Sequence, residues 1–170
     1  MEDLVPTIIG FCVALVLFFT IPAVSNGELI QSGLDTYVIH ETDVLGDQVC
    51  KDGYLSQEMY AAYLETLANT DMLYDVTMTV VHDTWYPVYD DAGNFTGEMT
   101  RIEEKTYTRD IRDALSQGAR CYYLKKGDRF SISVQSRSDT TIQQLLKAIG
   151  FKNLSGITAF GGGTVTDENY

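Results

Sequence analysis

The sequence predicts an α+β protein: a long N-terminal helix, transmembrane in its first half, followed by a small head with short helices and an antiparallel sheet of three to five strands. Three observations predict this class. An uncharged apolar run opens the chain, three- and four-residue apolar spacing follows it, and alternating patterns with turn signals fill the rest. The expected divisions are 1–27 transmembrane helix, 28–50 amphipathic continuation, 51–160 α+β head and 161–170 flexible tail.

The apolar run from Leu4 to Val24 has 21 residues and no charge. At about 1.5 Å per residue it would span roughly 31 Å, the thickness of a bilayer's hydrocarbon core. A cleaved secretory signal is one alternative, because Ala23-Val24-Ser25 has small-x-small character, and a buried helix of a soluble protein is another. The acidic start Met1-Glu2-Asp3 and the length of the run favour a retained single-pass anchor. Lys and Arg are missing from the flanks, so charge gives no orientation.

The amphipathic continuation is predicted from a periodic face. Its members recur at steps of three and four residues: Ile30, Leu34, Tyr37, Val38, Glu41, Val44 and Leu45. Gly27, Gly33 and Gly46 weaken this prediction, because glycine lowers helix stability.

The first half of the head is expected to hold a helix and a hairpin. Ser56 is the predicted N-cap of a helix that ends near Ala68-Asn69. Apolar and polar residues alternate from Tyr74 to Val80, which predicts a half-buried strand. The turn cluster of residues 90–94 predicts a hairpin with arms 84–89 and 95–103.

The second half of the head is expected to continue the mixed pattern. A short helix is predicted over 107–117 with Gly118 after its end, followed by strands over 120–124 and 129–135. Ser138 or Asp139 can cap a last helix over 140–149. The glycine-rich tail from Gly161 is expected to be frayed.

The net charge disfavours one class of partner. Acids outnumber bases 24 to 12, which gives −12 and an isoelectric point near 4.4. Such a surface repels a phosphate backbone, so no nucleic-acid partner is expected. The charge is also uneven: residues 1–100 hold 16 acids and one base, net −15, while residues 101–170 hold 8 acids and 11 bases, net +3.

No catalytic or metal-binding constellation is visible, so no enzyme activity and no cofactor are expected. The two histidines, His40 and His82, have no ligand spacing, and His40 reads as a solvated side chain. The turn residues 90–94 miss the calcium-loop pattern. Cys50 and Cys121 could form one disulfide if the head is extracytoplasmic, and two buried thiols are the alternative.

The aromatic segment Trp85-Tyr86-Pro87-Val88-Tyr89 is the remaining feature. We expect it to belong to the core with an edge of contact, and an exposed contact surface formed by Trp85, Tyr86 and Tyr89 is the alternative.

This layout resembles type IV pilin-like proteins, and in particular the tight-adherence (Tad) type pseudopilins of Gram-positive bacteria. The residues that carry the resemblance are Leu4–Val24, the continuation LDTYVIHET of residues 34–42, GYLSQEMY of residues 53–60, residues 64–70 and 74–76, and KGDRFSI of residues 126–132. The departure is at the start: no basic leader precedes the apolar run, and Glu2 and Asp3 stand where a mature pilin has its Glu.

The resemblance implies a non-enzymatic structural subunit of an envelope filament, adhesion pilus, secretion or DNA-transfer machine. Its partners would be the lipid bilayer, other pilin-like subunits and assembly-platform proteins, with the head outside the cell. The alternative function is a membrane-anchored extracytoplasmic binding or sensing module, which would not self-associate.

Overall fold

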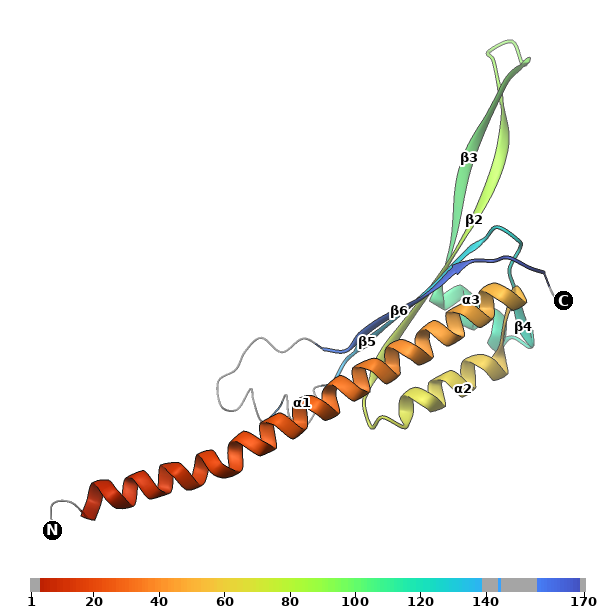
Figure 1. Cartoon of the computed structure of the whole chain (residues 1–170). Helices are drawn as coiled ribbons and strands as arrows, with labels where there is room; N and C mark the ends of the chain where they lie inside the picture. Colours follow the sequence, from red (N-terminus) through yellow and green to blue (C-terminus); the bar gives the residue numbers. More distant parts are fainter. Residues whose placement is uncertain (1–3, 139–143, 145–155, 169–170) are drawn as a thin grey trace.

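The computed structural model describes residues 4–138, 144 and 156–168, with one long helix lying against a twisted sheet (Figure 1). The described helices are α1 (Leu4–Asp52), α2 (Gln57–Ala68) and α3 (Thr108–Ser116). The described strands are β1 (Tyr54–Ser56), β2 (Tyr74–Tyr89), β3 (Phe95–Tyr107), β4 (Cys121–Tyr123), β5 (Arg129–Ser136) and β6 (Thr158–Thr164). The chain is therefore α+β.

All strand pairs are antiparallel and fall into two sheets. The larger sheet has the order β3-β2-β5-β6, and β1 pairs with β4 in a separate two-stranded sheet. Strand β2 is long enough to serve two roles. Its first part, up to Val81, pairs with β5 on one edge, and its later part pairs with β3 alone. The β2–β3 hairpin consequently projects beyond the body of the sheet (Figure 1).

The transmembrane assignment of the first half of the helix is wrong. Among the described residues, no helix is both long enough and apolar enough to cross a membrane.

The second half of α1 packs on the head through one narrow stripe. Val38, Thr42, Leu45 and Val49 are buried and recur at steps of three and four residues, so they share one helix face. Tyr37 and Val44, expected on the buried face, are exposed. The periodicity thus predicted the helix. Val38 and Leu45 lie on both the predicted and the observed face, and Thr42 and Val49 replace Tyr37 and Val44 on the buried stripe.

The contact between α1 and β6 depends on glycine. A Cβ on Gly46 would lie 2.3 Å from the backbone nitrogen of Gly162, and one on Gly161 would lie 2.4 Å from the carbonyl oxygen of Thr42. Helix and strand backbones therefore approach closely only because both lack side chains there. The expectation of a flexible tail from residue 161 is wrong, since residues 161–164 complete β6 and pair with β5.

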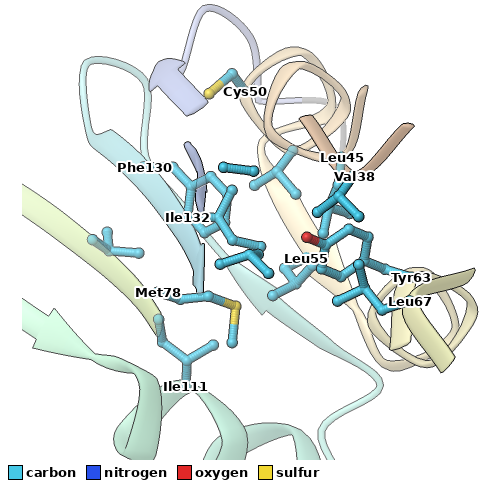
Figure 2. Packing of buried hydrophobic residues seen from close by; sticks show 14 of the residues in the cluster. Val38, Leu45, Cys50, Leu55, Tyr63, Leu67, Met78, Ile111, Phe130 and Ile132 are labelled. Carbon is cyan, nitrogen blue, oxygen red and sulfur yellow. The ribbon is translucent and has the colours of Figure 1, made fainter. Parts of the chain in front are cut away.

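The hydrophobic core fills the space between the sheet and the three described helices (Figure 2). Val76, Met78 and Val80 of β2 alternate inward, and each lies opposite an apolar residue of β5: Val134, Ile132 and Phe130 respectively. Leu67 of α2 and Ile111 of α3 close this core from the helix side.

The shorter helices largely follow the sequence prediction. Ser56 is the N-cap of α2, and its hydroxyl oxygen accepts a hydrogen bond from the Met59 N–H at 3.0 Å. Gly118 follows α3 with φ of 100°, a left-handed conformation that glycine adopts without strain. The helix expected over 140–149 lies outside the described residues except for residue 144.

Candidate functional site

The first part of α1 presents an apolar surface that nothing in the described chain covers. Its exposed large side chains are Ile8, Ile9, Phe11, Val13, Leu15, Val16, Leu17, Phe18, Phe19 and Ile21. Residues 15–19 are consecutive and cover more than one helical turn, so the helix is apolar on every side. A helix that is hydrophobic all round is normally buried. We call residues 8–21 the apolar segment.

The apolar segment is continuous with the buried half of the same helix. The head covers α1 from Val38 onward, whereas the apolar segment extends past the sheet and past α2 (Figure 1). One continuous helix, which contains Pro22, therefore carries a folded head at one end and the uncovered apolar segment at the other. The apolar segment has the composition of a protein interior, so its contact with an apolar partner surface is favourable because it removes apolar area from water.

The second candidate surface is the β2–β3 hairpin beyond Val81, which we call the arm. Trp85, Tyr86 and Tyr89 are 57%, 45% and 59% exposed, so the expectation that they belong to the core is wrong. The reason is topological: β5 ends its pairing at Val81, and no described element covers the arm. Tyr89 contacts Phe95 edge-on across the hairpin, with ring centroids 6.2 Å apart.

Charged side chains join the strands at the root of the arm. Arg101 lies 2.8 Å from the Asp83 carboxylate, and Arg129 donates a hydrogen bond of 2.8 Å to Glu103. Arg101 also reaches Glu103 at 3.2 Å, and Nζ of Lys105 lies 4.0 Å from the Glu103 carboxylate, so two acids and three bases form one cluster. The hydrogen bond from Arg129, its positive charge and the nearby Arg101 hold the pKa of Glu103 below its usual range.

A second polar contact fixes the arm from the core side. Nδ1 of His82 lies against the carboxylate of Asp128, which is only 5% exposed. The other carboxylate oxygen of Asp128 accepts the N–H of Lys125, and the Asp128 carbonyl oxygen accepts the N–H of Val165. Asp128 therefore ties the arm to the turn before β5 and to the segment after β6.

The structure records Cys50, Cys121 and Cys12 as free thiols, so the possible disulfide between Cys50 and Cys121 is not formed in it. Cys50 is buried near the end of α1 toward Gly163, whereas Cys121 opens β4 in the two-stranded sheet. Burial, with a smaller contribution from the Asp47 charge, raises the pKa of the Cys50 thiol, which keeps it protonated and unreactive. Cys50 is therefore a packing residue, whereas Cys121 is partly exposed.

The described surface carries one large open groove. A groove of about 700 Å³ lies beside β1 and β4 and is lined by residues that include Glu58, Arg120 and Cys121, and it is open to solvent. No cluster of metal-ligating side chains occurs within the described residues. His40 is exposed, in line with a solvated side chain.

The acidic turn at the tip of the arm also has a structural explanation. One carboxylate oxygen of Asp90 accepts the N–H groups of Ala92 and Asn94 at 3.0 and 2.7 Å. These hydrogen bonds, led by the one from Asn94, lower the pKa of Asp90, and they shape the turn without a cation.

Sequence reasoning missed three residues that position these surfaces. Thr42 is polar and lies within the buried stripe of α1, Gly46 is a contact point rather than a weak helix position, and Asp128 is buried in a turn. Only the i, i+4 spacing of Val38, Thr42 and Gly46 could have indicated one shared face. No protein-family model matches this chain, and no curated protein and no solved structure is significantly similar to it.

Proposed function

We propose that this protein is a non-enzymatic, self-assembling structural subunit of pilin-like type, whose apolar segments pack together while the heads face outward. The observation that carries the proposal is the uncovered apolar segment on the same helix whose other half builds the head core. Packing several such segments side by side removes their apolar area from water, and copies of the chain supply the apolar partner surface without any other protein.

The charges of the chain are compatible with this arrangement. The apolar segment, residues 8–21, includes no charged residue, so a bundle of apolar segments buries no ion. The first hundred residues carry net −15 and the remainder net +3, which favours contact between unlike regions of neighbouring copies over contact between like regions. The bundle would thus be apolar inside and charged only where heads meet.

Self-assembly is tested by one pair of matched variants in the full-length chain. Phe19 in the apolar segment and Phe160 on β6 are both 68% exposed. We expect Phe19→Ser to weaken association about 30-fold, because burying a phenylalanine side chain contributes roughly 2 kcal/mol. Phe160→Ser, which makes the same chemical change outside the apolar segment, should leave association unchanged.

Association is read from sedimentation velocity across a concentration series and from chemical cross-linking in producing cells. A wild-type chain that stays monomeric at every concentration contradicts the proposal. Equal weakening by both variants also contradicts it, since the effect would then not belong to the apolar segment.

A pilin-like subunit further implies a head outside the cell. Protease treatment of intact cells that carry an epitope after Tyr170 tests this, with lysed cells as the control. Loss of the epitope in intact cells agrees with an outward-facing head. Protection until lysis contradicts the pilin-like function and leaves an inward-facing assembly subunit.

The exposed arm favours a second candidate function, a binding module. Trp85 is the only tryptophan of the chain, so its fluorescence reports on the arm alone. A binding module would stay monomeric, and its Trp85 emission would not change with protein concentration. Monomeric behaviour together with a blue shift on addition of a candidate ligand would favour this function over assembly.

A further inference from the structure

The outer edge of β3 is the longest open strand edge of the described sheet. In the order β3-β2-β5-β6, β3 is an end strand, and it has 13 residues. Its side chains from Phe95 to Lys105 are exposed, and within the described residues only β2 pairs with it. An open edge of this length presents unpaired backbone N–H and C=O groups, which favour the addition of a further strand.

We propose that this edge binds the same edge of a second copy, so that two β3 strands pair antiparallel about a two-fold axis through Ile102. The arrangement of charges along the strand argues for this occupant and this register. With Ile102 opposite Ile102, Arg101 of each copy lies opposite Glu103 of the other. Directly opposed unlike charges stabilise an antiparallel pair, and like charges destabilise it.

Neighbouring registers lack this complementarity. A two-fold axis perpendicular to the sheet leaves the same face of both copies on the same side of the joined sheet. Because side chains alternate between faces along a strand, two residues opposed across the axis are both odd-numbered or both even-numbered. Centring the axis on Arg101 opposes Arg101 to itself and Glu98 to Glu104. Centring it on Glu103 opposes Glu103 to itself and Arg101 to Lys105. Centring it on Thr100 opposes no unlike charges. Among these registers only the axis through Ile102 gives attraction without repulsion.

The remaining opposed residues fit the same register. Met99 lies opposite Lys105, whose methylene groups offer apolar contact. Asp83 and Glu103 already pair with Arg101, Arg129 and Lys105 within one copy, so pairing two copies extends an existing ion network.

This contact goes beyond the proposed function, because the arm and the apolar segment are separate surfaces at different ends of the molecule (Figure 1). One joins copies through helices and the other joins them in pairs through strands. Each can therefore be removed while the other is measured.

Cysteine cross-linking tests the register in the full-length chain. Opposed residues of an antiparallel pair have Cα atoms about 4.5–5.5 Å apart, which a disulfide can bridge. Under mild oxidation Ile102→Cys should form a covalent dimer with itself, about tenfold more than Thr100→Cys, whose opposite residue is Glu104. Mixing Thr100→Cys with Glu104→Cys should restore the cross-link, and the wild type with its three native thiols is the background control.

Charge reversal is the second test and needs no new thiol. Arg101→Glu should weaken pairing about tenfold, because it opposes two acids at both symmetry-related positions. Arg101→Glu with Glu103→Arg should recover pairing, and circular dichroism confirms that each variant is folded. Absence of an Ile102→Cys dimer, or equal cross-linking by Thr100→Cys alone, overturns the proposal.

The two proposals fail separately. In a Phe19→Ser background, the large assemblies should require about 30-fold higher protein concentration, while the Ile102→Cys dimer should persist unchanged. If Phe19→Ser abolishes the Ile102→Cys dimer as well as the large assemblies, arm pairing depends on the packing of the apolar segments. That result would overturn the proposal of an independent contact.

Discussion

Tyr63 of α2 donates its buried hydroxyl hydrogen to Thr42 of α1. The two oxygens lie 2.8 Å apart, and the Thr42 hydroxyl already donates its own hydrogen to the carbonyl oxygen of Val38 at 2.6 Å. With its single hydrogen committed to Val38, Thr42 can only accept from Tyr63. This chain of two hydrogen bonds fixes the position of α2 along α1, and therefore the point where the head ends and the apolar segment continues.

Breaking this pair should cost more than removing both partners. Thr42→Val leaves the Tyr63 hydroxyl buried without an acceptor, and we expect a loss of about 1–3 kcal/mol in the free energy of unfolding. Tyr63→Phe leaves Thr42 with its bond to Val38 and should cost less. The double variant should be closer to wild type than the sum of the two, as measured by urea unfolding in a double-mutant cycle. Additive losses would contradict the contact.

The same tyrosine predicts alkaline sensitivity. Burial raises the pKa of Tyr63 from 10.0 to about 12, despite the opposing hydrogen bond with Thr42. A group with a raised pKa in the folded state contributes stability that is complete below its unfolded pKa and is lost as pH rises through the folded value. Stability should therefore fall between about pH 10 and 12, and the fall should be shallower in Tyr63→Phe. If stability falls equally steeply with pH in the wild type and in Tyr63→Phe, the ionisation of Tyr63 does not cause the fall.

Two glycines of α1 should respond in opposite directions to the same substitution. Gly46→Ala forces a Cβ against the backbone of Gly162, and we expect it to destabilise by about 3 kcal/mol or more. Gly33→Ala meets nothing within 4 Å and should stabilise the helix by about 0.5–1 kcal/mol. Thermal unfolding of both variants measures the difference. A neutral Gly46→Ala would mean that β6 does not lie on α1.

The ion cluster at the root of the arm should contribute most to the free energy of unfolding at neutral pH. Glu103 has a lowered pKa through its contacts with Arg129 and Arg101, so its contribution is present above the unfolded pKa and lost as pH falls through the folded value. The effect should be small and salt-sensitive, because these groups are exposed. Glu103→Gln should flatten the acid limb of the stability curve, whereas Glu98→Gln should leave it unchanged. Identical curves for both variants would count against the cluster.

The thiols should behave as unequal, unpaired groups. Wild type and Cys121→Ser should migrate alike on gels with and without reductant, because Cys50 and Cys121 are not bonded. Alkylation should modify the partly exposed Cys121 before Cys50, whose burial and raised pKa disfavour the thiolate. A change in gel migration on adding reductant, seen in the wild type and lost in Cys121→Ser, would show that Cys121 forms a disulfide.

Local patterns predicted the elements well, and long-range contacts explain the errors. The Ser56 cap, the Asp90 turn and the alternation of β2 are signals written within a few residues, so the sequence displays them. Residues 161–164 look like a flexible linker by composition, yet they belong to a strand. Glycine is needed there because Gly46 and Thr42 of α1 lie so close that no side chain fits between helix and strand. Pairing between residues so distant in sequence leaves no local pattern.

The candidate surfaces show the same limit. The apolar character of residues 8–21 is evident from the sequence, but its assignment to a membrane is wrong, since no described helix is long and apolar enough to cross one. Composition alone does not identify the apolar partner of such a segment. Trp85 and Tyr89 have the composition of core residues, and only the end of β5 pairing at Val81 shows that they are exposed. Whether aromatic residues of one strand are exposed depends on how far the neighbouring strand extends, and the sequence pattern of the first strand alone does not show that.

The position of β6 on α1 has a consequence for biosynthesis. The segment that covers the helix follows it late in the chain: Thr166 donates its backbone N–H to the carbonyl oxygen of Cys50, across a separation of 116 residues. Closing a loop of that length is slow relative to local structure formation. The nascent chain therefore carries both an unfinished head and the apolar segment until its last strand emerges, and during that interval it depends on whatever shields newly made apolar surface in the cell.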